Sequence, residues 1–267
     1  MLKNITLGQY YPADSFVHRL DPRIKIVLTI ALIVCVMLCK TLVGYTLILL
    51  YLLLCTRLST VPFSMLLKGL KPLRFIIVLT FILNLFFLQG ETVLLKWAFI
   101  TITQEGLTMA VHYSLRLVFL VMATSIMTLA TSPISLADGI ELLLSPLKVI
   151  HFPAHELAMI MTIALRMIPV LLEETDKIMK AQMARGADFE SGNLIKRAKA
   201  MVPLLVPLFV SAFRRATELA MAMEARCYHG GANRTRLRVL KLTRQDLYAA
   251  LSMVALIALI CVERAFL

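Results

Sequence analysis

Residues 26–55 read IVLTIALIVCVMLCKTLVGYTLILLYLLLC, and Lys40 is the only charged residue in this stretch. A helix of 30 residues would be about 45 Å long, whereas the hydrocarbon core of a bilayer is about 30 Å thick. A single straight helix over these residues would therefore be too long for one membrane span. We expect two short spans, residues 26–39 and 41–55, that turn near Lys40 and accommodate their short length by local thinning of the bilayer or by protein neighbours.

The composition of the whole chain agrees with a membrane protein. Of the 267 residues, 60% are hydrophobic and 16% are charged, compared with about 45–50% and 25% in soluble domains. Five cysteines, an odd number that lie mostly in apolar runs, exclude a secreted disulfide scaffold. The net charge is 28 − 16 = +12. We assign this excess to loops at the cytoplasmic membrane surface rather than to a nucleic-acid interface.

Three further apolar stretches, residues 75–88, 106–130 and 247–262, complete a prediction of five spans. With the N-terminus in the cytoplasm and the C-terminus outside, 24 of the 28 Lys and Arg residues fall on the cytoplasmic side. The runs 157–172 and 201–213 are also apolar. We keep them cytoplasmic, because making them spans would place six basic residues outside and violate the positive-inside rule.

The predicted fold is therefore an all-α membrane protein in three parts. Residues 1–131 form an N-terminal membrane domain with four spans. Residues 132–245 form a large cytoplasmic helical module, which is too long for a linker and too apolar to be disordered. Residues 246–267 form a C-terminal transmembrane helix.

Three helices are expected within the cytoplasmic module. Their predicted ranges are 135–144, 153–186 and 194–228. The first opens with a capping box from Ser135 to Asp138, the second is bent at Pro169, and the third is ended by the glycines at 230 and 231. Each long helix is apolar in its first half and charged in its last half. This polarity predicts one end against the membrane part and the other end presented to a cytoplasmic partner.

The two long helices end alike. Ala184-Arg185-Gly186 closes the first and Ala225-Arg226-Cys227 closes the second, so the arginines are 226 − 185 = 41 residues apart. A small neighbour leaves each guanidinium unobstructed, and the planar fork of Arg can meet a carboxylate with two parallel hydrogen bonds. A single Arg at a helix C-terminus can also serve only to complement the helix dipole. Its repetition on two helices favours a docking function.

At these residues the sequence resembles the T components, EcfT, of energy-coupling factor transporters, which are ABC-type importers of vitamins and metal ions. The resemblance covers nearly the whole chain. It is carried by residues 18–23, 131–133, 184–189, 210–216 and 225–228. The family carries two Ala-Arg-Gly signatures at the tips of coupling helices. Here the first signature is intact, and the second has Cys227 where Gly is usual. The match looks closer to the shared T components of Gram-positive bacteria than to those dedicated to cobalt or nickel.

The resemblance implies a multi-pass protein of the bacterial plasma membrane with two cytoplasmic ABC ATPase subunits and a substrate-binding membrane S component as partners. ATP-driven motion of the ATPases would pass through the coupling helices to the S component during vitamin uptake. The implied ATPase-docking residues are Ala184, Arg185, Gly186, Ala225, Arg226 and Cys227. The sequence indicates no catalytic residue, metal site, cofactor or nucleic-acid partner.

Two other classes of membrane protein are alternatives. A stand-alone channel or secondary transporter would use Arg116, with His112 one turn before it, because a charge inside a span is costly and often functional. Arg116 can equally snorkel or pair within the bundle. A multi-pass enzyme is the weaker alternative, because Pro153 separates His151 from His155 and the zinc-protease pattern fails. The sequence also lacks a Gly-x-x-x-x-Gly-Lys-Ser/Thr loop, so ATP chemistry is assigned to a partner.

Overall fold

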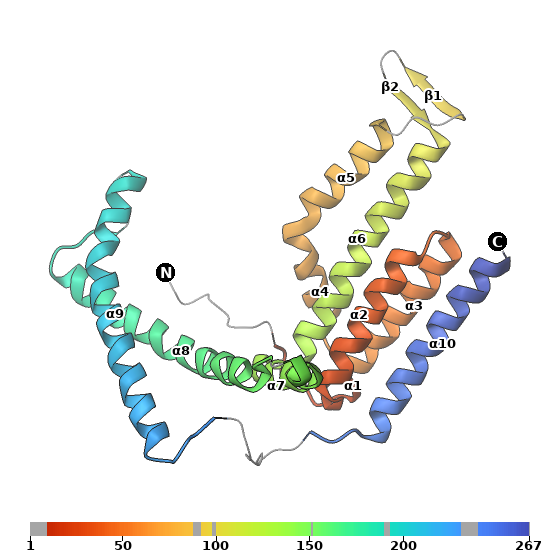
Figure 1. Ribbon diagram of the computed structural model, residues 1–267. Helices are drawn as coiled ribbons and strands as arrows, with labels where there is room; N and C mark the ends of the chain where they lie inside the picture. Colours follow the sequence, from red (N-terminus) through yellow and green to blue (C-terminus); the bar gives the residue numbers. More distant parts are fainter. Residues whose placement is uncertain are drawn as a thin grey trace. The chain divides into compact units, whose positions relative to one another are not determined.

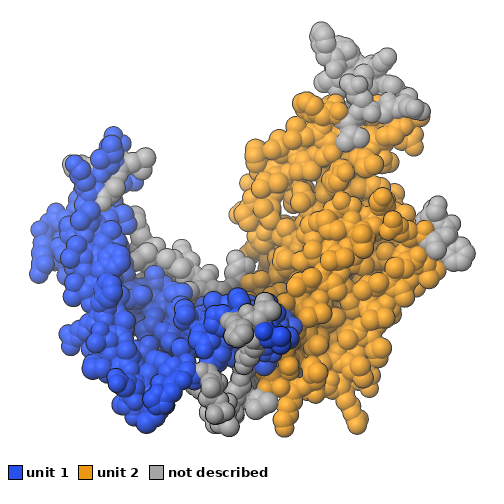
Figure 2. Space-filling view, viewed as in Figure 1, with its two compact units in different colours: residues 1–7, 140–238 blue, residues 8–139, 239–267 orange. Residues whose placement is uncertain are grey.

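The computed structural model describes residues 10–87, 92–97, 100–150, 152–189, 193–230 and 240–266, and helices dominate them (Figure 1). The chain divides into two compact units (Figure 2). Unit 1 comprises residues 140–238 with residues 1–7, and unit 2 comprises residues 8–139 with residues 239–267. Unit 2 therefore brings the C-terminal helix back to the N-terminal helices, and the chain passes between the units within one helix, α7 (Pro133–Leu144).

Unit 2 is an apolar helical bundle. Its elements are α1 (Phe16–Arg19), α2 (Pro22–Leu38), α3 (Leu42–Ser59), α4 (Phe63–Leu70), α5 (Arg74–Phe87), α6 (Gln104–Ala130) and α10 (Arg244–Phe266). A 3₁₀ turn, η2 (Lys71–Leu73), joins α4 to α5. An antiparallel hairpin of β1 (Val93–Trp97) and β2 (Ile100–Thr103) precedes α6, and the sequence analysis does not predict it.

The turn predicted near Lys40 is confirmed. Helix α2 ends at Leu38, and Thr41 caps α3 by accepting a hydrogen bond from the Gly44 N–H at 3.3 Å. Asp21 caps the other end of α2 in the same way, at 2.9 Å from the Arg23 N–H, and Pro22 occupies the first helical position. Local polar side chains thus fix the start of α2 and the start of α3.

The core of unit 2 is built on one face of α3. Tyr45, Ile48 and Leu52 recur at helical spacing, and each is no more than 2% exposed. They pack in one cluster with Val36 of α2 and Met253 of α10. The opposite face of α3 is apolar and exposed, as expected for a helix whose surroundings are lipid.

Six helical segments within the described ranges are long and apolar enough to cross a membrane. They are Leu42–Ser59, Phe63–Phe87, Gln104–Ala130, Ala154–Ala184, Lys199–Glu224 and Arg244–Arg264. The all-α membrane fold is confirmed. The five-span topology stays a prediction, because its spans are not the same set as these six segments. It counts α2, whose 17 residues extend about 26 Å and which is not one of the six. It leaves out the two segments that belong to unit 1.

Unit 1 consists mainly of α8 (Ala154–Ala184) and α9 (Leu194–Glu224), with the 3₁₀ turn η3 (Ser145–Ile150) before them. Both long helices were predicted, and both continue through their internal prolines. Several boundaries differ from the prediction, and α8 covers Ala154–Ala184 rather than 153–186. The capping box at residues 135–138 is wrong, because Ser132 caps α7 at 3.2 Å from the Ser135 N–H and the helix starts at Pro133. Helix α9 stops at Glu224 rather than at residue 228.

Candidate docking site at two helix ends

The end of α8 is a Schellman motif built around Gly186. The Ala187 N–H donates to the Gln182 carbonyl at 3.0 Å, and the Gly186 N–H donates to the Met183 carbonyl at 2.9 Å. Gly186 has a φ of +89°, in the left-handed region that glycine enters without a steric cost. These two bonds satisfy the last carbonyls of the helix, which ends at Ala184 with Arg185 as its C-cap.

The end of α9 repeats this motif bond for bond. The Tyr228 N–H donates to the Met223 carbonyl at 3.1 Å, and the Cys227 N–H donates to the Glu224 carbonyl at 2.8 Å. Cys227 has a φ of +54° and so takes the left-handed conformation that Gly186 takes at the first end. A non-glycine residue pays about 1–2 kcal/mol for this conformation. This left-handed residue is also the reason that α9 ends before the predicted position.

All six predicted docking residues lie at these two ends, and all six are exposed. They are Ala184, Arg185, Gly186, Ala225, Arg226 and Cys227. Arg185 and Arg226 occupy the same position in the two motifs, immediately before the left-handed residue. Neither forms an ion pair with a residue that the structure describes. Their guanidinium groups are therefore available to an external acidic group. That they dock a partner stays a prediction.

Helices α8 and α9 cross, as Figure 1 shows, and a polar contact joins them. Both Nε and Nη2 of Arg215 donate to the Glu174 carboxylate, at 3.0 and 2.8 Å, and the Ser211 hydroxyl donates to its other oxygen. Glu174 thus accepts three hydrogen bonds from α9. Ser211 and Arg215 belong to the run 210–216 that carries part of the family resemblance, but the sequence assigned no contact to them or to Glu174.

The crossing contact has the same chain offset as the two arginine ends. Arg215 follows Glu174 by 41 residues, as Arg226 follows Arg185 by 41. Glu174 and Arg215 therefore each lie 11 residues before their own arginine, which is about 16 Å along either helix axis. The two ends extend equally far from one joint. This shared offset is visible in the sequence, but the contact between Glu174 and Arg215 follows only from how the two helices pack.

In unit 2, a buried carboxylate ties the start of α2 to the start of α10. Asp246 is 3% exposed, and its carboxylate accepts from the Asp21 N–H at 2.8 Å and from the Thr243 N–H at 2.7 Å. Asp21 in turn pairs with Arg23 at 2.8 Å. Burial acts to raise the pKa of Asp21, but the hydrogen bonds from Arg23 outweigh it and the net pKa is lowered. The run 18–23, which carries part of the family resemblance, thus has a structural role.

Arg116 lies within the bundle and is paired there. Its Nη2 donates to the Cys39 carbonyl at 3.1 Å, at the C-terminal end of α2, and its guanidinium lies 5.4 Å from the centre of the Tyr113 ring. At the start of α3, Glu263 accepts the Gly44 N–H at 3.0 Å. The positive Arg116 faces the negative C-terminal end of α2, and the negative Glu263 faces the positive N-terminal end of α3, so both charges are favourable to the helix dipoles. This geometry favours pairing within the bundle over a transport pathway.

Of the histidines considered for a metal site, His155 has another contact. His155 Nδ1 lies 2.9 Å from Glu141 Oε1, which links α8 to α7. His151 lies outside the described residues. Within the described ranges, no three His, Cys, Asp or Glu side chains gather closely enough to hold a metal ion.

The fold defines a multi-pass, all-α protein of the membrane, with two arginine-bearing helix ends on a separate unit. Comparison with known proteins specifies the family. The family model described as CbiQ, cobalt transport protein, matches residues 13–237. The chain is 54% identical over 265 residues to the energy-coupling factor transporter transmembrane protein EcfT of Clostridium kluyveri, covering 99% of this chain and 98% of the relative.

Two further relatives carry the same description. The protein of Acidaminococcus fermentans is 54% identical over 264 residues, covering 99% of this chain and 98% of the relative. That of Bacillus subtilis is 48% identical over 266 residues, covering 99% of this chain and 100% of the relative. The chain belongs to this family of transmembrane components of energy-coupling factor transporters. It is therefore a multi-pass bacterial membrane protein.

Proposed function

We propose that the chain couples two cytoplasmic ABC ATPases to a substrate-binding membrane S component. ATP-driven motion of the ATPases enters at the two arginine ends, passes along α8 and α9, and reaches the S component, which releases the imported vitamin. The observation that carries this proposal is the pair of matched, exposed ends on two crossed helices. A single ATPase would need one such end, and two ATPase subunits need two.

The geometry of each end suits docking into a groove. The left-handed cap turns the chain away directly after the arginine, so the helix presents a blunt end. Ala184 and Ala225 add no bulk beside the guanidinium. An acidic side chain in the partner's groove could accept two parallel hydrogen bonds from each Arg. Each end thus offers a charged group on a narrow, backbone-defined tip.

An exposed apolar stripe on α9 supports an interaction with a second membrane protein. Val202, Val206, Phe209 and Phe213 recur at helical spacing and are 53%, 60%, 62% and 72% exposed. Contiguous exposed apolar surface of this kind marks a protein or membrane interaction site. We assign this stripe to the S component, because motion that enters at the arginine ends must leave through another surface of the same helices.

The proposal requires both arginine ends in the cytoplasm. The five-span topology meets this requirement and leaves 24 of the 28 Lys and Arg residues on the cytoplasmic side. Treating both α8 and α9 as spans would place the Arg185 end and the Arg226 end on opposite sides of the membrane. Two cytoplasmic ATPases could not then dock on both.

The test is reconstitution of the chain in proteoliposomes alone, with the two ATPases, and with the ATPases and an S component. We expect no ATP hydrolysis by the chain alone, ATP hydrolysis when the ATPases are present, and vitamin uptake only in the full assembly. ATP turnover by the chain alone would contradict the proposal. Substrate uptake by the chain alone would support the channel or secondary-transporter alternative.

A further inference from the structure

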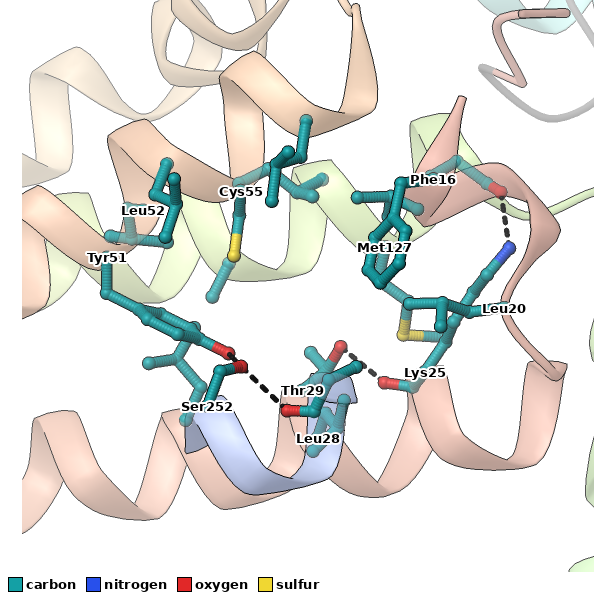
Figure 3. A pocket seen from close by; sticks show the side chains of 18 of the residues that line it. Phe16, Leu20, Lys25, Leu28, Thr29, Tyr51, Leu52, Cys55, Met127 and Ser252 are labelled. Carbon is teal, nitrogen blue, oxygen red and sulfur yellow. Dashed lines mark hydrogen bonds between the residues drawn. The ribbon is translucent and has the colours of Figure 1, made fainter. Parts of the chain in front are cut away.

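A cavity of about 260 Å³ lies inside unit 2, where α1, α2, α3, α6 and α10 meet (Figure 3). Its walls include the buried residues Leu52 and Ala249. Three other lining residues are strongly exposed: Leu54 at 52%, Leu58 at 42% and Tyr248 at 62%. Because these belong to α3 and α10, the cavity opens to the surface between two helices that are long and apolar enough to span the bilayer.

The polar side chains in the wall form hydrogen bonds within the protein, and apolar side chains make up most of the wall. Lys25 has the one charged side chain among the described lining residues, and its Nζ donates to the carbonyls of His18 and Ala130, both at 2.9 Å. The hydroxyl groups of Tyr51 and Ser252 lie 3.3 Å apart, as Figure 3 shows. The chemistry of the wall therefore selects an apolar ligand.

The size of the cavity also argues for an occupant. The cavity has room for several water molecules, but water needs more polar partners than this wall offers. An apolar cavity of this kind binds apolar molecules instead. The apolar group present at its mouth in a membrane is the acyl chain of a lipid.

Two basic residues lie at the same end of the helices that form the mouth. Arg57 directly precedes Leu58 near the C-terminal end of α3, and Arg244 precedes Tyr248 by one turn at the start of α10. Both side chains are exposed, and neither forms an ion pair with a described residue. A tyrosine at a membrane-facing mouth with arginines beyond it matches the polarity of a phospholipid at the bilayer interface.

We propose that this cavity is a phospholipid site that holds one acyl chain, with the lipid phosphate bound at Arg57 and Arg244. The acyl chain enters between Leu54 and Tyr248 and fills the space toward Ala249. The bound lipid joins the end of α3 to the start of α10, two segments almost 200 residues apart in the sequence. The site is distinct from the arginine ends of unit 1 and does not depend on their function.

The experiment uses the full chain in vesicles of phosphatidylethanolamine and phosphatidylglycerol, with a small fraction of phosphatidylglycerol that carries a diazirine near the end of one acyl chain. The protein is extracted in detergent, washed to remove loosely held lipid, and irradiated. We expect the retained lipid to crosslink to cavity residues such as Leu28 and Met127. Crosslinks confined to exposed residues such as Val254, or no retained lipid, would overturn the proposal.

Matched variants test the acyl-chain position. Ala249→Phe fills the cavity and should lower the crosslinked lipid per chain at least about tenfold, since the acyl chain loses the apolar space that it occupies. Ala255→Phe places the same side chain on an exposed face of the same helix and should leave crosslinking unchanged. The wild-type crosslink map tests the proposal even if Ala249→Phe fails to fold.

The phosphate position is tested by Arg57→Ala and Arg244→Ala. Each should lower retention of the diazirine lipid about fivefold, the contribution of one basic side chain at a membrane surface. Arg264→Ala, at the other end of α10, should have no effect. Three results would overturn the proposal: equal retention in all three arginine variants, labelling by a diazirine fatty acid but not by the phospholipid, and loss of the cavity crosslinks when the partner proteins are bound.

Discussion

The ends of α8 and α9 reach the same backbone geometry with different residues. Gly186 occupies the left-handed position of the first end at φ +89°, and Cys227 occupies that of the second at φ +54°. The two Schellman hydrogen bonds are present at both ends. The comparison teaches that the arginine is positioned by the backbone cap rather than by the identity of the residue after it. Glycine lowers the conformational free-energy cost of the cap, but the end of α9 shows that the cap also forms with cysteine.

The largest effect is expected from removing both arginines. If each guanidinium pairs with a buried acidic group, its loss leaves that group unpaired and should cost about 2–5 kcal/mol at each interface. Arg185→Ala or Arg226→Ala should therefore lower affinity for the ATPases at least about tenfold, and the double variant should lower it further. Retention of the ATPases on the tagged chain measures this.

Lys180→Ala is the matched control for these variants. Lys180 is an exposed cation near the same end of α8, paired with Asp176 at 2.7 Å. An exposed pair contributes about 0.2–1 kcal/mol, so ATPase retention should hardly change. If the double arginine variant retained the ATPases as fully as Lys180→Ala does, the arginines would serve only the helix dipoles.

A smaller effect is expected from exchanging the residues that form the caps. Cys227→Gly relieves the left-handed strain and should stabilise the second end by about 1 kcal/mol, with assembly preserved. Gly186→Val places a β-branched residue at φ +89° and should destabilise the first end by about 2 kcal/mol. ATPase retention and the thermal unfolding midpoint of the full chain measure both. A loss of assembly in Cys227→Gly would show that the thiol itself is needed.

The smallest effect is expected at the crossing of the two helices. Arg215 is 42% exposed in its pair with Glu174, so a double-mutant cycle of Glu174→Gln and Arg215→Ala should give a coupling energy of about 0.5–1 kcal/mol. Because the contact is shared by both helices, each change should weaken binding at both ends equally. Arg214→Ala, which removes an exposed pair within α9 alone, is the control. An effect confined to one end would contradict a shared joint.

The sequence predicted the elements of the fold better than their ends. Apolar runs and the charge at Lys40 located α2, α3, α5, α6 and α10, since these features are local, whereas the shorter helices α1 and α4 were not predicted. The start of α7 was misplaced because Ser132 and Ser135 are both acceptable caps, and only the structure distinguishes them. The end of α9 was misplaced because a cysteine in the left-handed conformation has no sequence signal.

The predictability of the candidate site follows the same division. The two Ala-Arg ends are visible in the sequence, because each is a local motif at the end of a long helix. The crossing of Glu174 with Ser211 and Arg215 depends on how two helices pack, which local patterns do not encode. The buried link from Asp246 to the Asp21 N–H was missed for the same reason, since 225 residues separate its partners.

The central claim is that both arginine ends lie on the cytoplasmic side of the membrane. The most direct test is thiol labelling in right-side-out vesicles, with Cys35, Cys39, Cys55 and Cys261 replaced. One test protein keeps the native Cys227, which reports on the second end. The other carries Cys227→Ala and Asp188→Cys, so that its single cysteine at position 188 reports on the first end. An impermeant reagent should label neither protein until the vesicles are permeabilised. Labelling at residue 188 in intact vesicles, with Cys227 protected, would contradict the claim.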